Sequence, residues 1–332
     1  MKRLFIPLIA VLLLSCAQSP ANAQGDKEKA KEEKQKAKEA EREDRQKTKE
    51  VERLERYKKE YPEEFKTHIS KEFAVSKSVT SSVLAIYNVT GPIKVEGYSG
   101  DKVLIEIDET ISGKTTADLE TGKKEFKLGF DQIGDTVAAF IVSPYDSRPH
   151  QNYNNGYNYW DEDRKRIEYR YHLAFTVKVP FNMNLNISTV NDGNVTVENV
   201  AGMLRVRNVN GSISIKNAKN TTDAKTINGD LTVNYLNNPT EASSYYTLNG
   251  KLTVTYQPNL SADLQFKSMN GEFYTDFPDA QVLPTKVNLT KDKKNDGTIY
   301  RINKNSDVRI GSGGKVFKFE TLNGNIYIQK QS

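Results

Sequence analysis

Apolar and polar residues alternate along the middle of the chain in units of about nine residues. Units such as NVTVENVAG (194–202), MLRVRNVNG (203–211) and SISIKNAKN (212–220) carry apolar residues at their second and fourth positions, and several units end in Asn-Gly. Alternation with a period of two is typical of β-strands, and a fixed repeat of short units is typical of a repetitive architecture. The pattern therefore predicts a series of short strands separated by tight turns.

Two arrangements of these strands compete. A two-residue hairpin at Asn210-Gly211 places Leu204 opposite Asn217, which puts a core residue and a solvent residue on one face of the sheet. Stacking each residue on the residue 18 positions later instead forms apolar columns, for example Val195, Ile213 and Leu231. We therefore predict an all-β fold, a two-sided parallel β-solenoid (β-helix) with about 9 residues per strand and 18–21 per coil.

Residues 70–332 form this predicted solenoid domain, with a long insertion at 144–172 and one short helix at 114–125. The preceding segment, 26–66, differs sharply because it holds 15 basic and 14 acidic residues. Glu precedes a basic residue by four positions several times, a spacing that stabilises helices. We predict a charged N-terminal α-helix that Pro62 ends and that serves as a spacer. A weak heptad of apolar residues leaves a coiled coil as the alternative.

The first residues have the features of a bacterial export signal. Lys2 and Arg3 precede an apolar run, 4–14, that is too short to span a membrane. Leu13-Leu14-Ser15-Cys16 is similar to the lipobox of bacterial lipoproteins, whereas Ala21-Asn22-Ala23 is a site for ordinary secretion. We favour the first site, which makes 1–15 the signal peptide, Cys16 the lipid attachment residue and 16–25 a short linker. The expected location is the bacterial cell envelope, with a membrane anchor.

Composition narrows the chemistry. The net charge of +5 comes from 48 basic and 43 acidic residues that are interleaved, so no nucleic-acid partner is expected. One Cys and three His exclude an internal disulfide and disfavour a metal or histidine-based catalytic centre. Outward carboxylates are expected beside cations, as in the pairs Glu198/Lys216 and Asp223/Arg205, rather than facing each other as in a glycosidase. We expect no enzymatic activity, no catalytic residue, no cofactor and no metal.

The insertion 144–172 is the most unusual stretch of the solenoid domain because it is rich in aromatic and amide side chains. Such residues present large amphipathic surfaces that suit a glycan or a protein ligand. The candidate ligand contacts are Tyr153, Tyr157, Tyr159 and Trp160. In the alternative interpretation, these aromatic side chains pack against the flank of the solenoid.

The run FTVKVP (175–180), the Asn-Gly units that follow it and the tail IGSGGKVFKFETLNGNIYI (310–328) together resemble the bacterial "putative adhesin" family of β-strand-repeat proteins, a domain of unknown function. In the family the tail corresponds to the closing strands. The resemblance covers residues 70–330 and implies an exported parallel β-solenoid without established activity. We expect a non-enzymatic envelope lipoprotein for binding or adhesion. The alternatives are a periplasm-facing structural or envelope-stress component and, more weakly, a carbohydrate-active β-helix enzyme.

Overall fold

The computed structural model describes residues 45, 48, 52–53, 55–75, 80–149, 167–284, 286–294 and 297–331, except for the side chains of 286–294 and 297–306. The chain divides into two compact units, Met1–Glu60 and Tyr61–Ser332. The described residues of the first unit are helical, whereas β1 begins at Glu63, directly after Pro62. The helix is thus shorter than the predicted 26–66, because Glu63 to Lys66 belong to a strand. No helix among the described residues is long and apolar enough to cross a membrane.

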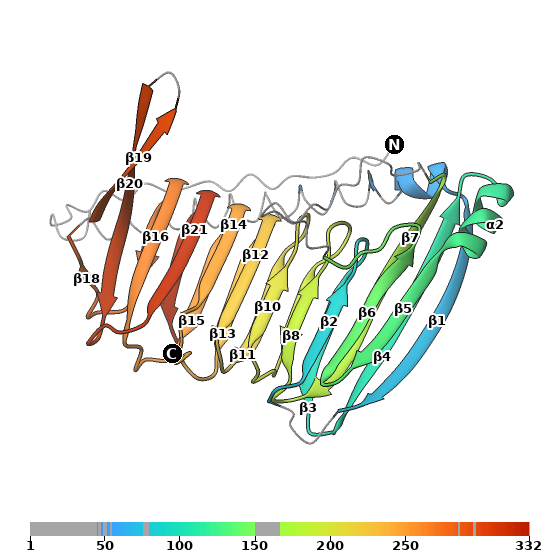
Figure 1. Ribbon diagram of the computed structural model, residues 1–332, viewed down its shortest axis with the longest axis horizontal. Coiled ribbons are helices and arrows are strands. Elements are labelled where there is room, and N and C mark those ends of the chain that lie inside the picture. Colours follow the sequence, from blue (N-terminus) through green and yellow to red (C-terminus); the bar gives the residue numbers. More distant parts are fainter. Residues whose placement is uncertain are drawn as a thin grey trace, which may run out of the picture. The chain divides into compact units, whose positions relative to one another are not determined.

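The second unit consists mainly of two large sheets, which confirms the all-β prediction (Figure 1). In spatial order, the ten-stranded sheet holds β1 (Glu63–Ala74), β4 (Lys102–Gly113), β7 (Tyr169–Pro180), β3 (Ile93–Tyr98), β9 (Val195–Glu198), β11 (Ile213–Ala218), β13 (Leu231–Tyr235), β15 (Leu252–Tyr256), β22 (Ile326–Lys330) and β17 (Phe273–Thr275). The twelve-stranded sheet holds β18 (Gln281–Val282), β20 (Gly297–Ile310), β16 (Ala262–Asn270), β21 (Val316–Asn323), β14 (Ser244–Asn249), β12 (Thr222–Asn228), β10 (Leu204–Arg207), β8 (Asn184–Ser188), β2 (Val83–Tyr87), β6 (Thr136–Ser143) and β5 (Lys127–Ile133), with β19 (Lys286–Lys294) paired to β20.

From β7 to β17 the chain passes alternately from one sheet to the other. We call a strand of the twelve-stranded sheet, together with the next strand of the ten-stranded sheet, a rung. Equivalent strands of neighbouring rungs pair in parallel, and Ile213 lies between Val195 on one side and Leu231 on the other. The predicted stacking of each residue on the residue 18 positions later is therefore confirmed in this region, and Leu231 pairs with Leu252, 21 positions later.

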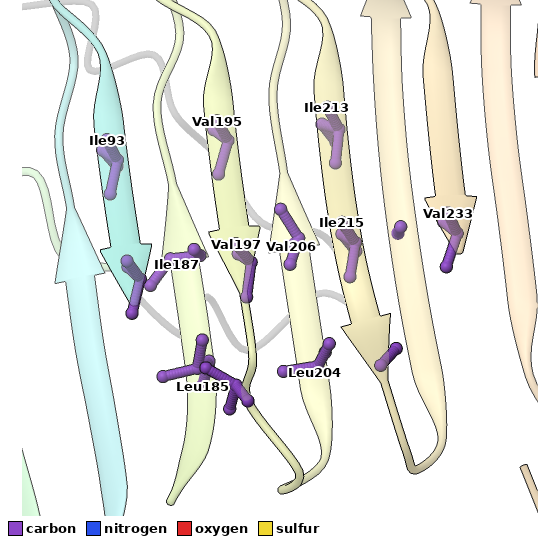
Figure 2. Packing of buried hydrophobic residues seen from close by; sticks show 14 of the residues in the cluster. Ile93, Leu185, Ile187, Val195, Val197, Leu204, Val206, Ile213, Ile215 and Val233 are labelled. Atoms are coloured by element: carbon purple, nitrogen blue, oxygen red, sulfur yellow. The ribbon is translucent and has the colours of Figure 1, made fainter. Parts of the chain in front are cut away.

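The core lies between the two sheets and is built from the apolar positions of each rung. Val195, Val197, Ile213 and Ile215 from one sheet and Leu204 from the other are at most 2% exposed. Their side chains point into the space between the sheets (Figure 2). Burying one such side chain contributes about 1.5–3 kcal/mol, so the repeated alternation supplies the main stabilisation of the fold.

Side-chain amides connect the Asn-Gly turns along one edge of the stack. The amide of each asparagine donates to the side-chain oxygen of the asparagine in the neighbouring rung at 2.7–2.9 Å, and the series consists of Asn191, Asn210, Asn228, Asn249, Asn323 and Asn270. The glycine that follows permits close stacking, because a Cβ on Gly229 would lie 2.3 Å from the carbonyl oxygen of Gly211. The Asn-Gly turns therefore join successive rungs instead of closing hairpins.

The end of the stack that carries β1 is antiparallel and includes the predicted short helix. β4 pairs with β1 and β7, and β5 pairs with β6, all in antiparallel register. Helix α2 (Thr116–Glu125) begins with a capping box between Thr115 and Asp118, which explains its sharp start. Residues 169–172, which the sequence analysis assigned to the insertion, are the first four residues of β7.

The tail occupies a different place from the one expected. The resemblance implied that the tail, 310–328, forms closing strands, but that end of the twelve-stranded sheet is formed by β18 and β20, with β19 paired to β20. Strands β21 and β22 form an interior rung between β14–β15 and β16–β17, with Tyr245 paired to Phe319 and Phe319 to Phe266. Likewise the rung β2–β3 lies between β6–β7 and β8–β9. Hydrophobic alternation places a strand in a sheet but does not select its neighbours.

Candidate ligand-binding face

The ligand contacts and the lipid attachment residue proposed from the sequence lie outside the described residues. This applies to Cys16 and to Tyr153, Tyr157, Tyr159 and Trp160. Their roles therefore stay predictions. The candidate site below lies on the described part of the second unit.

The outer face of the ten-stranded sheet displays a column of polar and aromatic side chains. We call it the hydroxyl–aromatic column. Its members come from the strand position between the two inward apolar residues, and the parallel register places them side by side in the order Thr196, Ser214, Thr232, Thr253, Tyr327 and Tyr274. Four short hydroxyl side chains are thus followed by two aromatic rings.

The two tyrosine rings at the end of this column stack on each other. The ring centroids of Tyr274 and Tyr327 are 4.9 Å apart and the ring planes differ by 8°. Tyr274 lies on the last strand of the sheet and is 39% exposed. On the other side, the ammonium group of Lys251 lies 6.0 Å from the centroid of Tyr327. The result is a cation and two parallel rings on an open face.

Polar groups surround the edges of both rings. The hydroxyl of Tyr274 donates to the carboxylate of Glu272, and Nδ2 of Asn325 donates to the hydroxyl of Tyr327 at 3.3 Å. The hydrogen bond to Glu272, aided by partial desolvation, raises the pKa of Tyr274 to about 12. Tyr274 is therefore neutral at physiological pH. A flat neutral ring with hydrogen-bonding groups at its edge suits an amphipathic ligand.

Ionisable groups elsewhere on the outer faces pair with each other. Lys216 lies 2.8 Å from Glu198, as predicted, and its hydrogen bond holds the pKa of Glu198 below the ordinary value. Asp223 lies 3.9 Å from the predicted partner Arg205, but its closer partner is Arg207. Burial favours a higher pKa for Asp223, yet hydrogen bonds from Arg207 and Ser244 outweigh it and lower that pKa. These carboxylates are engaged in structural ion pairs.

One histidine lies between two carboxylates on the strands β1 and β4. Nδ1 of His68 is 2.8 Å from Asp108 and Nε2 is 2.7 Å from Glu106. These hydrogen bonds raise the pKa of His68, because both favour the doubly protonated ring. Among the residues that the structure describes, no group of three or more His, Cys, Asp or Glu could hold a metal ion. The His68 cluster is thus an exposed ion-pair network.

Sequence reasoning missed Tyr274 and Tyr327 because it looked for aromatic clusters in loops. The signal exists in the repeat itself. When the units of the ten-stranded sheet are aligned, which are every second unit of the repeat, the outward position is Thr or Ser in four of them and becomes Tyr in NIYI and EFYT. Aromatic residues at neighbouring outward positions form an apolar patch on the surface, and such patches often mark interaction sites. A comparison of the outward positions would therefore have found this pair.

Comparisons with known proteins agree with the sequence resemblance. The model of the family described as Toastrack DUF4097 matches residues 182–311. No curated protein sequence matches the chain. A structure from Clostridium sporogenes described as a "putative cell adhesion protein" is 9% identical, covers 80% of this chain and 100% of its own, and has a TM-score of 0.33. A "putative adhesin" from Bacteroides fragilis is 11% identical, covers 80% of this chain and 97% of its own, and has a TM-score of 0.31.

A third structure, described as a "putative lipid binding protein" from Parabacteroides distasonis, is 10% identical with a TM-score of 0.23, and the match covers 80% of this chain and 97% of that one. The family match is the informative result, because it falls on the repeating units from which the resemblance was drawn. Residues 182–311 of the chain therefore match the Toastrack DUF4097 family, a domain of unknown function.

Proposed function

We propose that this protein is an exported bacterial envelope protein, anchored by a lipid at Cys16, whose β body is a non-enzymatic binding module. In this proposal the body is a two-sided parallel solenoid that presents the hydroxyl–aromatic column to a ligand on the cell surface. The observation that carries the proposal is the exposed Tyr274, stacked on the half-buried Tyr327 on the outer face of the ten-stranded sheet.

The architecture supports such a role because it holds the outward side chains in fixed positions. Each rung is hydrogen-bonded to its neighbours through backbone, and the asparagine series joins the turns. Side chains that are pre-organised in this way lose little freedom on binding. The nearby ionisable groups pair with one another, which favours binding over acid–base catalysis.

Adsorption to isolated cell envelopes tests the binding role. The full chain, purified in detergent, is mixed with envelopes from the producing bacterium, and the pelleted fraction gives the affinity. We expect the double variant Tyr274→Ala/Tyr327→Ala to bind at least 10-fold more weakly. Tyr246→Ala, on the outer face of the other sheet, is the matched control and keeps full binding. Equal binding by the double variant and the wild type refutes the proposed face.

The anchor and orientation are tested in cells. We expect fatty-acid label on the wild type and none on Cys16→Ala, and we expect protease to remove the body from intact cells. Label that is independent of Cys16 contradicts the anchor. A body that is protected until the outer layer is opened contradicts surface adhesion and supports the periplasm-facing structural alternative.

A further inference from the structure

Strand β1 is the first strand of the ten-stranded sheet, and one of its two backbone edges is open among the residues that the structure describes (Figure 1). The backbone of residues 65–73 pairs with β4 alone, in one continuous antiparallel register. Neither a proline nor a bulge interrupts this stretch. A long, regular edge strand presents unpaired N–H and C=O groups, which can pair with the backbone of another chain.

The apolar positions of β1 are symmetric about Ile69. Phe65, Ile69 and Phe73 lie on one face of the strand at intervals of four residues. A second copy that pairs antiparallel to β1, with a two-fold axis at Ile69, places Phe65 opposite the partner's Phe73 and Ile69 opposite the partner's Ile69. The ammonium group of Lys123 lies 4.9 Å from the centroid of the Phe65 ring, yet this side chain is still 40% exposed. Its exposed part is available to a partner.

The charged positions on the other face of β1 match in the same register. With the axis at Ile69, Lys66 lies opposite the partner's Glu72. An axis at His68 instead places Glu64 opposite the partner's Glu72, which brings like charges together. Within the chain, Lys66 lies 3.1 Å from Glu64, and Glu72 lies 3.0 Å from Lys102. Exposed ion pairs of this kind contribute little to stability, so their side chains can exchange partners.

Two charged side chains on the inner face form no ion pair with any described residue. The ammonium group of Lys71 lies 5.8 Å from the ring centroid of Phe130, and Glu109 on β4 is half-buried, so that burial raises its pKa. An inward lysine on an edge strand ordinarily opposes pairing. In the register centred on Ile69, however, the partner's Lys71 lies beside Thr67, which pairs with Glu109. The Cβ atoms of the two charged residues are then about 10 Å apart, a distance that their side chains can span.

We propose that β1 is a self-association surface, through which two copies of this chain pair antiparallel about a two-fold axis at Ile69 and join their ten-stranded sheets into one. This inference goes beyond the binding role proposed above and does not depend on it. A second copy fits better than a foreign peptide, because the match of apolar and charged positions lies within the sequence of β1 itself. A two-fold interface of this type forms each contact away from the axis twice.

Disulfide trapping on the full chain in detergent tests the register. In the paired strands the Cα atoms of the two copies of residue 69 are about 4.5–5.5 Å apart, which is within the range of a disulfide. We expect Ile69→Cys to form a covalent dimer under mild oxidation, and we expect the wild type, whose single cysteine is Cys16, to form none.

Ile133→Cys is the matched control for disulfide trapping. Ile133 is 77% exposed on β5, and the neighbouring Gln132 donates to the carbonyl oxygen of Ala74 at one end of β1. The two copies of Ile133 therefore lie at opposite ends of the paired strands, so this variant is expected to stay monomeric. Equal cross-linking of Ile69→Cys and Ile133→Cys contradicts the proposed register.

Sedimentation velocity of the full chain in detergent measures the association itself. We expect Lys66→Glu and Glu72→Lys each to raise the Kd of the dimer about 10-fold, because each substitution creates two like-charge contacts. The double variant Lys66→Glu/Glu72→Lys exchanges the two charges and is expected to restore Kd to within about 3-fold of the wild type. This recovery separates loss of the interface from loss of the fold.

Three outcomes overturn the proposal. The first is a wild-type chain that stays monomeric at about 100 µM. The second is a monomer in which the amides along the open edge of β1 are protected from hydrogen exchange, because another segment of the same chain then covers the edge. The third is a double variant that dimerises no better than the single variants. Envelope adsorption by Tyr274→Ala/Tyr327→Ala tests the proposed function separately, so either proposal can fail while the other stands.

Discussion

Three tyrosine hydroxyls are buried in the core near the interior rung of the tail, where Thr222 and Ser243 are also buried. The hydroxyl of Tyr245 lies 2.7 Å from that of Tyr235 and 3.1 Å from that of Tyr256. Burial raises the pKa of all three phenols, so they are neutral over the physiological range. A buried hydroxyl is costly unless it is hydrogen-bonded, and here Tyr245 satisfies two others at once.

Tyr245→Phe tests this network. We expect the free energy of unfolding to fall by about 1–3 kcal/mol, because the hydroxyl of Tyr256 loses its partner inside the core. Urea denaturation measures the change. Tyr246→Phe alters the next residue, which faces outward, and is expected to leave stability within about 0.5 kcal/mol. Similar losses in both variants contradict the inward network.

The Asp223 ion pair predicts a pH dependence of stability at the acid side. Because folding lowers the pKa of Asp223, the ion pair stabilises the fold above the unfolded-state pKa of about 3.9, and this contribution disappears as the pH falls through the lower folded-state pKa. We expect Asp223→Asn to be less stable than the wild type at pH 7. As the pH falls from about 5 to about 2, the variant is expected to lose less stability than the wild type, because it has no carboxylate to protonate at this position. Thermal unfolding at several pH values measures both effects.

The exposed Asp101→Asn is the control for this measurement, and we expect it to follow the wild-type pH profile. A wild-type acid profile in Asp223→Asn contradicts a role for the pair with Arg207.

At the scale of the element, the turns as well as the strands hold neighbouring rungs together. Asn249 donates to Asn228 at 2.9 Å and accepts from Asn323 at 2.7 Å, so one side chain connects three rungs. The turns therefore help to fix which rung lies beside which, a choice that inward apolar columns alone do not make.

Asn249→Ala removes both of these hydrogen bonds. We expect a loss of about 1–2 kcal/mol in the free energy of unfolding, since each exchanged hydrogen bond contributes about 0.5–1.5 kcal/mol. The matched control is Asn234→Ala, an exposed asparagine on the middle of β13, with an expected change below about 0.5 kcal/mol. An equal effect of both substitutions means that the asparagine series does not stabilise the stack.

The strands could be predicted from the sequence because their alternation of apolar and polar residues is visible within each unit. The second and fourth positions of each unit identify Val195, Ile213 and Leu231 as one inward column, and the structure pairs them in that way. The stacked tyrosines were not found, because a search for core periodicity passes over outward positions. Tyr153 and Trp160 lie outside the described residues, so their role as ligand contacts stays a prediction.

At the scale of the second unit, two rungs lie between strands that are distant from them in sequence. These rungs are β2–β3 and β21–β22. Ser244 pairs with Lys318, and Lys318 pairs with Gln265, so the rung β21–β22 separates two rungs that follow each other in sequence. No local pattern predicts this order, because parallel pairing depends on contacts between residues that are distant in the chain.

Removal of residues 312–332 tests the importance of the interior rung. We expect the truncated chain to bind a hydrophobic dye such as ANS and to melt at least 10 °C lower, because the facing edges of β14 and β16 lose their hydrogen-bonded neighbour. As a control, replacement of 288–303 by a short turn shortens the β19–β20 hairpin, in which β19 lies off the main path of the sheet and pairs with residues 297–305 of β20, while β16 pairs with 306–310. This variant is expected to keep the wild-type melting temperature. A truncated chain with normal melting contradicts the interior placement.

The interior position of the tail has a consequence for how the protein is made. A chain that emerges from its N-terminus can add the rungs from β8–β9 to β14–β15 in order, but β16 and β17 have no parallel partner until residues 316–330 arrive. Residues 316–330 are synthesised after β14–β17 and must enter between them, so the closed stack shows that the chain has been delivered at least as far as β22. A chain that stops before residue 316 leaves the facing edges of β14 and β16 unpaired, and open strand edges of this kind are prone to pair with other chains.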